Sequence, residues 1–76
     1  MRTYYQPIKH ILYDNNEEID ELPKELFSFQ AFRFPEEADL WLLEHGYEPM
    51  EFDIHMYYDD QIEDVVLIDV HGNNLD

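Results

Sequence analysis

The sequence predicts an α+β fold, in which a small antiparallel sheet includes a C-terminal β-hairpin and one main helix packs on one face. Three stretches support this prediction. Residues 51–58 alternate between apolar and polar side chains, residues 65–71 are rich in β-branched side chains, and residues 35–45 carry the start and stop signals of a helix. At this length we expect a single domain that spans residues 1–76.

The N-terminal third predicts a strand followed by irregular structure. Residues 3–13 are aromatic and β-branched, and Pro7 restricts this strand to a sheet edge or interrupts it. Asp-Asn-Asn at 14–16 is typical of a turn. Residues 17–26 have apolar side chains at helical spacing, but Pro23 lies inside the pattern. We therefore expect a short helical turn on either side of this proline.

The middle of the chain predicts a strand and then the main helix. Residues 27–34 resemble a strand whose apolar side chains change face midway, which indicates a bulge or burial on both faces. The helix over 35–45 begins with Pro35, which suits the first helical position, and Gly46 suits the position just past its end. Its apolar side chains fall on two opposite sides. Other parts of the chain therefore either cover the helix on both sides or leave an apolar patch exposed on one of them.

The predicted hairpin joins 51–58 to 65–71 through a longer loop. Both apolar faces must point to one core, which fixes the parity of the pairing. We favour the register that sets Asp53 opposite His71 and His55 opposite Asp69, because it pairs opposite charges. The predicted core consists of Phe29, Phe32, Trp41, Leu42, Phe52, Ile54, Met56, Val66, Ile68 and Val70.

Charge is the most unusual property of the composition. Nineteen acidic residues face four basic ones, for a formal charge of −15. Such a chain repels nucleic acid and anionic membranes, and it attracts a basic partner. The absence of cysteine excludes a disulfide scaffold and thiol catalysis. No apolar run reaches the roughly 20 residues of a membrane span, and the N-terminus lacks a signal-peptide core, so we expect a cytoplasmic protein.

We therefore expect a small, acidic, non-enzymatic binding protein that engages a basic protein partner, with no cofactor. Acids at alternate strand positions lie about 6.6–6.8 Å apart, near the interval of backbone phosphates. The narrower expectation is thus a nucleic-acid mimic that inhibits a nucleic-acid-binding protein. The alternative is an ordinary acidic surface that aids solubility and binds no specific partner. The predicted binding surface consists of Glu51, Asp53, Asp59, Asp60, Glu63, Asp64 and Asp69.

Two other function classes stay open. The polar face of the hairpin carries imidazoles and carboxylates, which are ligands for zinc and similar ions, so a small metal-binding or catalytic domain is the runner-up. Its weak metal candidates are His55, His71, Asp53 and Asp69. The remaining histidines, His10 and His45, stand alone in the sequence and are expected at the edge of the core.

The third class is a homodimeric structural or interaction module. Leu40 and Leu43 lie on the side of the helix opposite Trp41, and Val65 and Leu67 lie on the outer face of the predicted hairpin. Contiguous exposed apolar side chains commonly mark an interface, so Leu40 and Leu43 are the predicted apolar contact residues.

Overall fold

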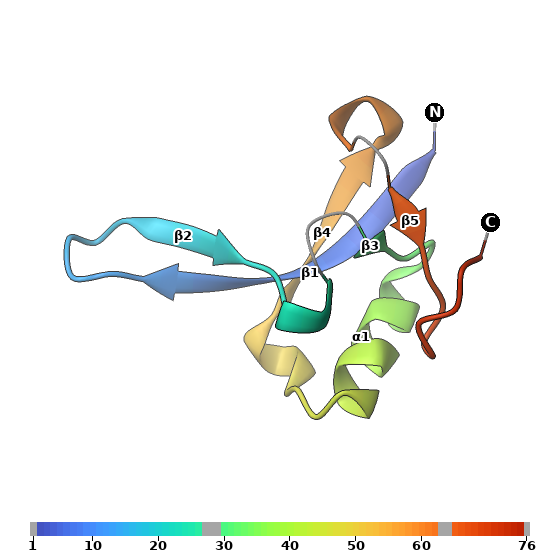
Figure 1. Ribbon diagram of the computed structural model, residues 1–76. Coiled ribbons are helices and arrows are strands. Elements are labelled where there is room, and N and C mark those ends of the chain that lie inside the picture. The colour runs from blue at the N-terminus through green and yellow to red at the C-terminus, as the bar shows by residue number, and fades with distance from the viewer. Residues whose placement is uncertain (1, 27–29, 63–64, 76) are drawn as a thin grey trace.

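The structure is a computed structural model that describes residues 2–26, 30–62 and 65–75. It confirms the predicted α+β class, because one main helix packs against a small antiparallel sheet of three strands (Figure 1). No helix within these ranges is long and apolar enough to cross a membrane.

The three-stranded sheet has the order β2-β1-β4, with both neighbours antiparallel to β1. β1 spans Thr3–Leu12, β2 spans Glu18–Glu21 and β4 spans Asp53–Tyr58. β1 changes partner along its length: its first six residues pair with β4 and its last four with β2. The pairing with β2 forms a two-stranded ribbon that projects from the body of the molecule (Figure 1).

Pro7 lies inside β1, one residue before the last pair with β4. The backbone of Tyr5 exchanges two hydrogen bonds with Phe32, on the side away from β4. Residues two apart on a strand direct their backbone groups to the same side, so the nitrogen of Pro7 also points there. Among the described residues no strand pairs with this side at Pro7, and the pairing with β2 begins at Lys9. The proline therefore removes no hydrogen bond from the pairing with β4.

The segment before Pro23 differs from the prediction. Residues 18–21 form a strand, whereas a helical turn was expected before Pro23; a 3-10 turn at Lys24–Leu26, after the proline, is as expected. The chain reverses between Tyr13 and Glu17, where Asn16 takes a positive φ of 62°. This reversal aligns residues 18–21 with the end of β1, and pairing with that strand outweighs the helical spacing of the apolar side chains.

The main helix, α1, spans Pro35–Glu44, one residue shorter than predicted. Gly46 follows it with a φ of 81°, which a residue with a side chain would adopt only with strain. Two short strands, β3 at Gln30–Ala31 and β5 at Val66–Leu67, pair in parallel beside it. Ala31 and Phe32 are adjacent and both fully buried, so this stretch is buried on both faces.

The two stretches of the predicted hairpin contain β4 and β5, but their partners correct the predicted register. His55 lies opposite Gln6 and Asp53 opposite Ile8, both on β1, rather than opposite Asp69 and His71. β5 is only two residues long and pairs with β3. The physical reason is that β1 offers β4 six consecutive pairs, whereas β5 is too short to compete for it.

The core lies between α1, β1 and the segment after β5. Its buried members are Leu26, Phe32, Ala38, Trp41, Leu42 and Ile68, with Tyr47, Phe52 and Ile54 packed against them. The core prediction is wrong for two residues, because Met56 is 51% exposed and Val66 is 40% exposed. On β5 the buried side chain is that of Leu67, which was assigned to the outer face. Val70 is half-buried, and Phe29 lies outside the described residues.

The contrast between Phe32 and Met56 gives a stability test. Phe32→Ala should lower the free energy of unfolding by about 3–5 kcal/mol, because it empties a fully buried site. Met56→Ala should cost less than about 1 kcal/mol, because half of this side chain already contacts solvent. Urea titrations of both variants measure the difference. Equal losses would contradict the observed placement of Met56.

Candidate functional site

Three strands bring five ionisable side chains to one face of the sheet. Residues opposite each other in adjacent strands point to the same face. Asp20 of β2 lies opposite His10, and Asp53 of β4 lies opposite Ile8, two residues before His10. We name the set on this face the histidine cluster. It consists of His10, Glu18, Asp20, Asp53 and His55.

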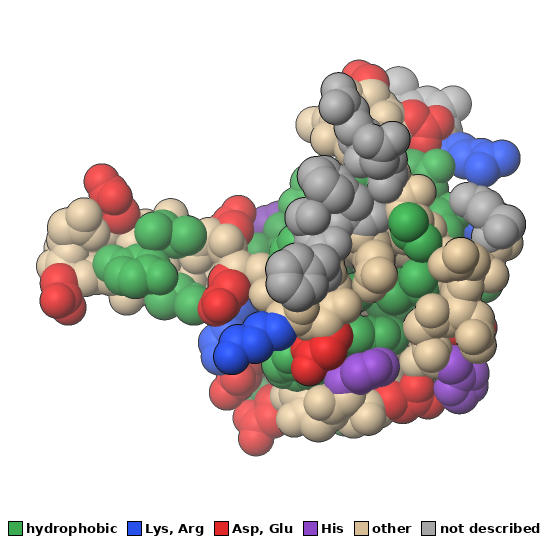
Figure 2. All heavy atoms as spheres, viewed as in Figure 1, with side chains coloured by type: hydrophobic (Ala, Val, Ile, Leu, Met, Phe, Trp, Pro, Cys, Tyr) green, Lys and Arg blue, Asp and Glu red, His purple; other side chains and the backbone are tan. Residues whose placement is uncertain are grey.

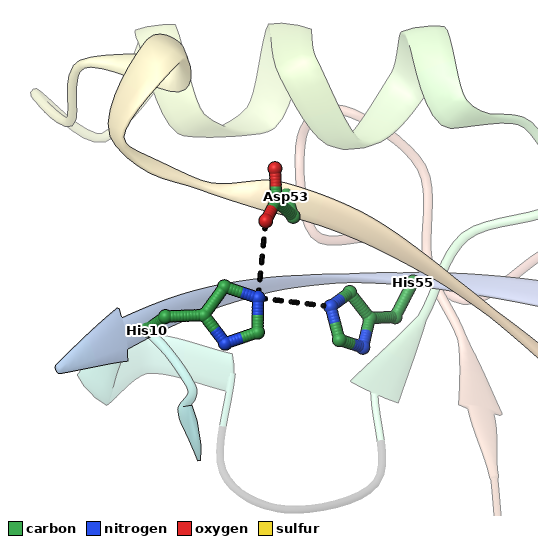
Figure 3. Close-up of side chains that lie close together, drawn as sticks. All are labelled: His10, Asp53 and His55. Carbon is green, nitrogen blue, oxygen red and sulfur yellow. Dashed lines mark hydrogen bonds and ion pairs between the residues drawn. The ribbon is translucent and has the colours of Figure 1, made fainter. Parts of the chain in front are cut away.

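His10 is the centre of this cluster, and both of its ring nitrogens have partners. Its Nδ1 lies 2.8 Å from an Asp20 carboxylate oxygen and 3.2 Å from one of Glu18. Its Nε2 lies 3.0 Å from Asp53 Oδ2 and 3.3 Å from His55 Nε2 (Figure 3). Four groups from β2 and β4 therefore surround one imidazole of β1.

The acids around His10 set its charge. A hydrogen bond from the imidazole to the Asp20 carboxylate is the largest cause that raises the pKa of His10 above its ordinary value. Desolvation acts in the opposite direction, and the negative charges of Glu18, Asp20 and Asp53 add to the upward shift. The stabilisation from this raised pKa is fully present below the pKa of the unfolded chain. It is lost as the pH rises through the pKa of the folded chain.

The cluster is open to solvent. The side chain of His10 is 30% exposed, whereas those of Asp20 and Asp53 are 55% and 70% exposed. Within the described ranges, His10, Asp53 and His55 form the group whose possible metal-ligand atoms all lie within 4.8 Å of one another. The arrangement can therefore hold a proton or a cation between strands at the protein surface.

The other two predicted metal candidates lie elsewhere. Asp69 Oδ1 accepts hydrogen bonds from the backbone N–H groups of His71 and Asn73, both at 2.9 Å, and these bonds lower the pKa of Asp69. Asp69 thus fixes the turn after β5. The Nδ1 atom of His71 lies 3.6 Å from Oε2 of Glu44, the last residue of α1. The predicted convergence of all four candidates is wrong, because it depended on pairing the two stretches of the hairpin with each other.

The structure also separates the predicted acidic surface. Glu51 forms an ion pair with Lys9 at 3.1 Å, and Asp53 belongs to the histidine cluster. Asp59 and Asp60 lie past the far end of β4, where Asp59 accepts a hydrogen bond from the backbone N–H of Arg2. These acids therefore lie at two ends of a six-residue strand, about 20 Å long. Glu63 and Asp64 of the same prediction lie outside the described residues.

A denser acidic surface lies on the projecting ribbon. Its outer part, residues 12–21, carries five carboxylates and no lysine or arginine, and each of these ten residues is exposed. Leu12, Tyr13 and Ile19 add exposed apolar area, at 72%, 53% and 47% (Figure 2). We call residues 12–21 the acidic ribbon. Its carboxylates are Asp14, Glu17, Glu18, Asp20 and Glu21.

Sequence reasoning missed both His10 and the acidic ribbon. The signal was present, because the Asp-Asn-Asn turn lies between residues 9–12 and the alternating acids and isoleucine of 17–21. Reading these two runs as one hairpin would have placed His10 beside Asp20. The helical spacing of apolar side chains up to Leu26 concealed this hairpin.

The apolar contact residues of the predicted homodimer are exposed. Leu40 is 50% and Leu43 is 59% exposed on the outer side of α1. Leu67, which the same prediction placed on an outer face, is buried. Self-association through the helix stays a prediction.

Replacing the strongest partner of His10 tests the electrostatics of the cluster. Asp20→Asn should lower the pKa of His10, because it removes the carboxylate that accepts its hydrogen bond. Titration of the imidazole nitrogen shifts by NMR, in the presence of a chelator, measures this pKa. Glu21→Gln is the matched control, because Glu21 lies opposite Lys9 rather than His10. An unchanged pKa of His10 in Asp20→Asn would contradict the arrangement described.

Comparisons of the chain with protein-family models, with curated proteins and with solved structures gave no match.

Proposed function

We propose that this protein is a non-enzymatic binding protein whose acidic ribbon engages a basic protein partner. The observation that supports this function best is the concentration of five carboxylates in ten exposed residues that project from the body of the molecule (Figure 1). A projecting element can enter a groove of a partner, and its backbone is already ordered by pairing with β1. Little conformational entropy is then lost on binding.

The charge distribution favours a basic partner over any other. The formal charge of −15 steers positively charged surfaces toward the chain, and complementary charge accelerates association. Lys9, at the base of the ribbon, is engaged by Glu51 at 3.1 Å and lies over the ring of Phe52. The ammonium group of Lys9 is therefore paired with a carboxylate that lies outside the ribbon.

The ribbon also offers apolar area for the interior of an interface. Ile19 lies opposite Ile11 on one face, whereas Leu12 and Glu18 share the opposite face. Protein interfaces combine an apolar centre with a polar rim, and charge alone gives rate and specificity more than affinity. The mixture of exposed apolar and acidic side chains thus fits a protein partner that has a basic rim around an apolar groove.

The narrower proposal is that the partner is a nucleic-acid-binding protein and that the ribbon occupies its nucleic-acid site. Glu18 and Asp20 lie two residues apart on β2 and on the same face, which sets them about 6.6–6.8 Å from each other along the strand. Acids at this interval can meet arginine and lysine side chains that otherwise contact successive phosphates. Such a partner should release nucleic acid when it binds this protein.

A charge-matched pair of variants tests the proposal. Tagged protein is used to capture partners from a bacterial lysate, and binding to each recovered partner is then measured with purified components. Raising the salt from about 0.1 M to about 1 M shortens the screening length from about 10 Å to about 3 Å, and it should release the partner. The ribbon variant D14N/E17Q/E21Q should bind at least about tenfold more weakly than the wild type, since it removes three of the five ribbon charges.

The control variant E36Q/D39N/E48Q removes the same number of charges from exposed positions on α1 and after it. Its affinity should stay within about threefold of the wild type if the ribbon is the contact surface. Equal losses in the two variants would show a non-specific charge effect and would contradict the ribbon as the binding surface. A fluorescent DNA or RNA duplex bound to the partner provides a further test. A nucleic-acid mimic should displace the duplex, whereas a protein that binds the partner outside its nucleic-acid site should not.

A further inference from the structure

We propose that His10, Asp53 and His55 form a binding site for a divalent transition metal ion of the zinc class. The three side chains come from two strands that pair with each other, β1 and β4, and they point toward one another (Figure 3). Their possible ligand atoms all lie within 4.8 Å of one another. Pairing of β1 with β4 sets the positions of Asp53 and His55, and pairing of β1 with β2 sets that of His10, so the arrangement does not depend on an ion.

The distances between ligand atoms fit a zinc coordination sphere. Zinc bonds of about 2.0–2.1 Å at tetrahedral angles place neighbouring ligand atoms about 3.3 Å apart. In the structure, His10 Nε2 lies 3.3 Å from His55 Nε2 and 3.0 Å from Asp53 Oδ2. Two of the three edges are thus already formed. The third edge, between Asp53 and His55, lies within 4.8 Å, and the side chain of Asp53, which is 70% exposed, has room to rotate.

The partners of His10 prepare it to act as a ligand. Histidines that bind metal commonly donate their other ring N–H to a carboxylate, which fixes the tautomer. The carboxylate of Asp20 is this partner for His10, because its Oδ1 lies 2.8 Å from His10 Nδ1. When Nδ1 of His10 carries the proton, its Nε2 lone pair faces Asp53 Oδ2, and it also faces a lone pair of His55 Nε2 in the tautomer of His55 that is protonated at Nδ1. In that state a cation between the three atoms would replace the repulsion between lone pairs with three metal–ligand bonds.

The donor set selects the class of ion. Two imidazole nitrogens and one carboxylate favour zinc and neighbouring transition metals, whereas magnesium and calcium prefer oxygen ligands alone. Three protein ligands leave a fourth position for water or for a group from another molecule. The three ligands lie outside residues 12–21, and the ribbon variant D14N/E17Q/E21Q retains every residue of the histidine cluster, so the two proposals can be tested separately.

Calorimetric titration of the intact chain with zinc chloride tests the site. Millimolar magnesium in the buffer occupies non-specific sites among the carboxylates, so that one zinc ion per chain should remain detectable. His10→Ala and His55→Ala should each weaken zinc binding by about 100-fold or more, because each removes a ligand. Asp20→Asn should weaken it by about 10–100-fold, the usual effect of losing an outer partner. His71→Ala is the matched control and should leave the affinity unchanged, because His71 lies near Glu44.

Imidazole NMR signals of the wild type provide a second readout that does not depend on folding of the variants. Zinc should shift the ring nitrogens of His10 and His55 and leave those of His45 and His71 in place. Far-UV circular dichroism checks that each variant is folded. Zinc affinity that is equal in the wild type, His10→Ala and His55→Ala would overturn the proposal. So would the absence of saturable zinc binding in magnesium buffer.

Discussion

The structure depends on the pairing of β1 with two partners in succession. Residues 3–8 bind β4 and place the N-terminal half of β1 under α1, where it helps to form the core. Residues 9–12 bind β2 and carry the strand beyond the body as one side of the ribbon. Pro7 lies one residue before the last pair with β4, and its missing N–H interrupts no bond to β4. A shift of β1 by one residue would exchange its two faces, and both the core and the histidine cluster would be lost.

The histidine cluster lies where the body continues into the ribbon. His10 is the second residue of β1 to pair with β2, and it contacts carboxylates of β2 and β4 together. Without a positive charge, Asp20 and Asp53 would repel across β1. A proton on His10, or the metal ion proposed above, offsets this repulsion and links three strands. Occupancy of the cluster also changes the charge at the base of the acidic ribbon. The two proposed sites are therefore neighbours: the three proposed metal ligands lie outside residues 12–21, whereas Glu18 and Asp20 belong to both the ribbon and the histidine cluster.

The sequence predicted the fold class, the helix and the existence of both C-terminal strands, because each depends on local signals. Pro35 marks the start of the helix and Gly46 its end, and the alternation from Glu51 to Tyr58 indicates β4. It did not predict the partner of β4, since alternation fixes which side chains share a face but not which strand lies beside them. For the same reason Asp53 and His55 were identified as candidate ligands while His10, their true neighbour, was assigned to the edge of the core. The contact between them joins residues 45 apart in the chain, and no local pattern encodes it.

The account depends most on the alignment of β1 with β4, and a proton–proton NOE between two imidazole rings tests this alignment directly. The ring centroids of His10 and His55 lie 5.2 Å apart, so a spectrum of the chain with assigned histidine rings should show a cross-peak between them. In the register favoured by the sequence, His55 lies opposite Asp69, and its ring would instead give cross-peaks to protons of residues 69–71. Cross-peaks between His10 and His55 would support both the fold and the cluster. Cross-peaks from His55 to residues 69–71 alone would contradict the pairing of β1 with β4, on which the core and the metal site depend.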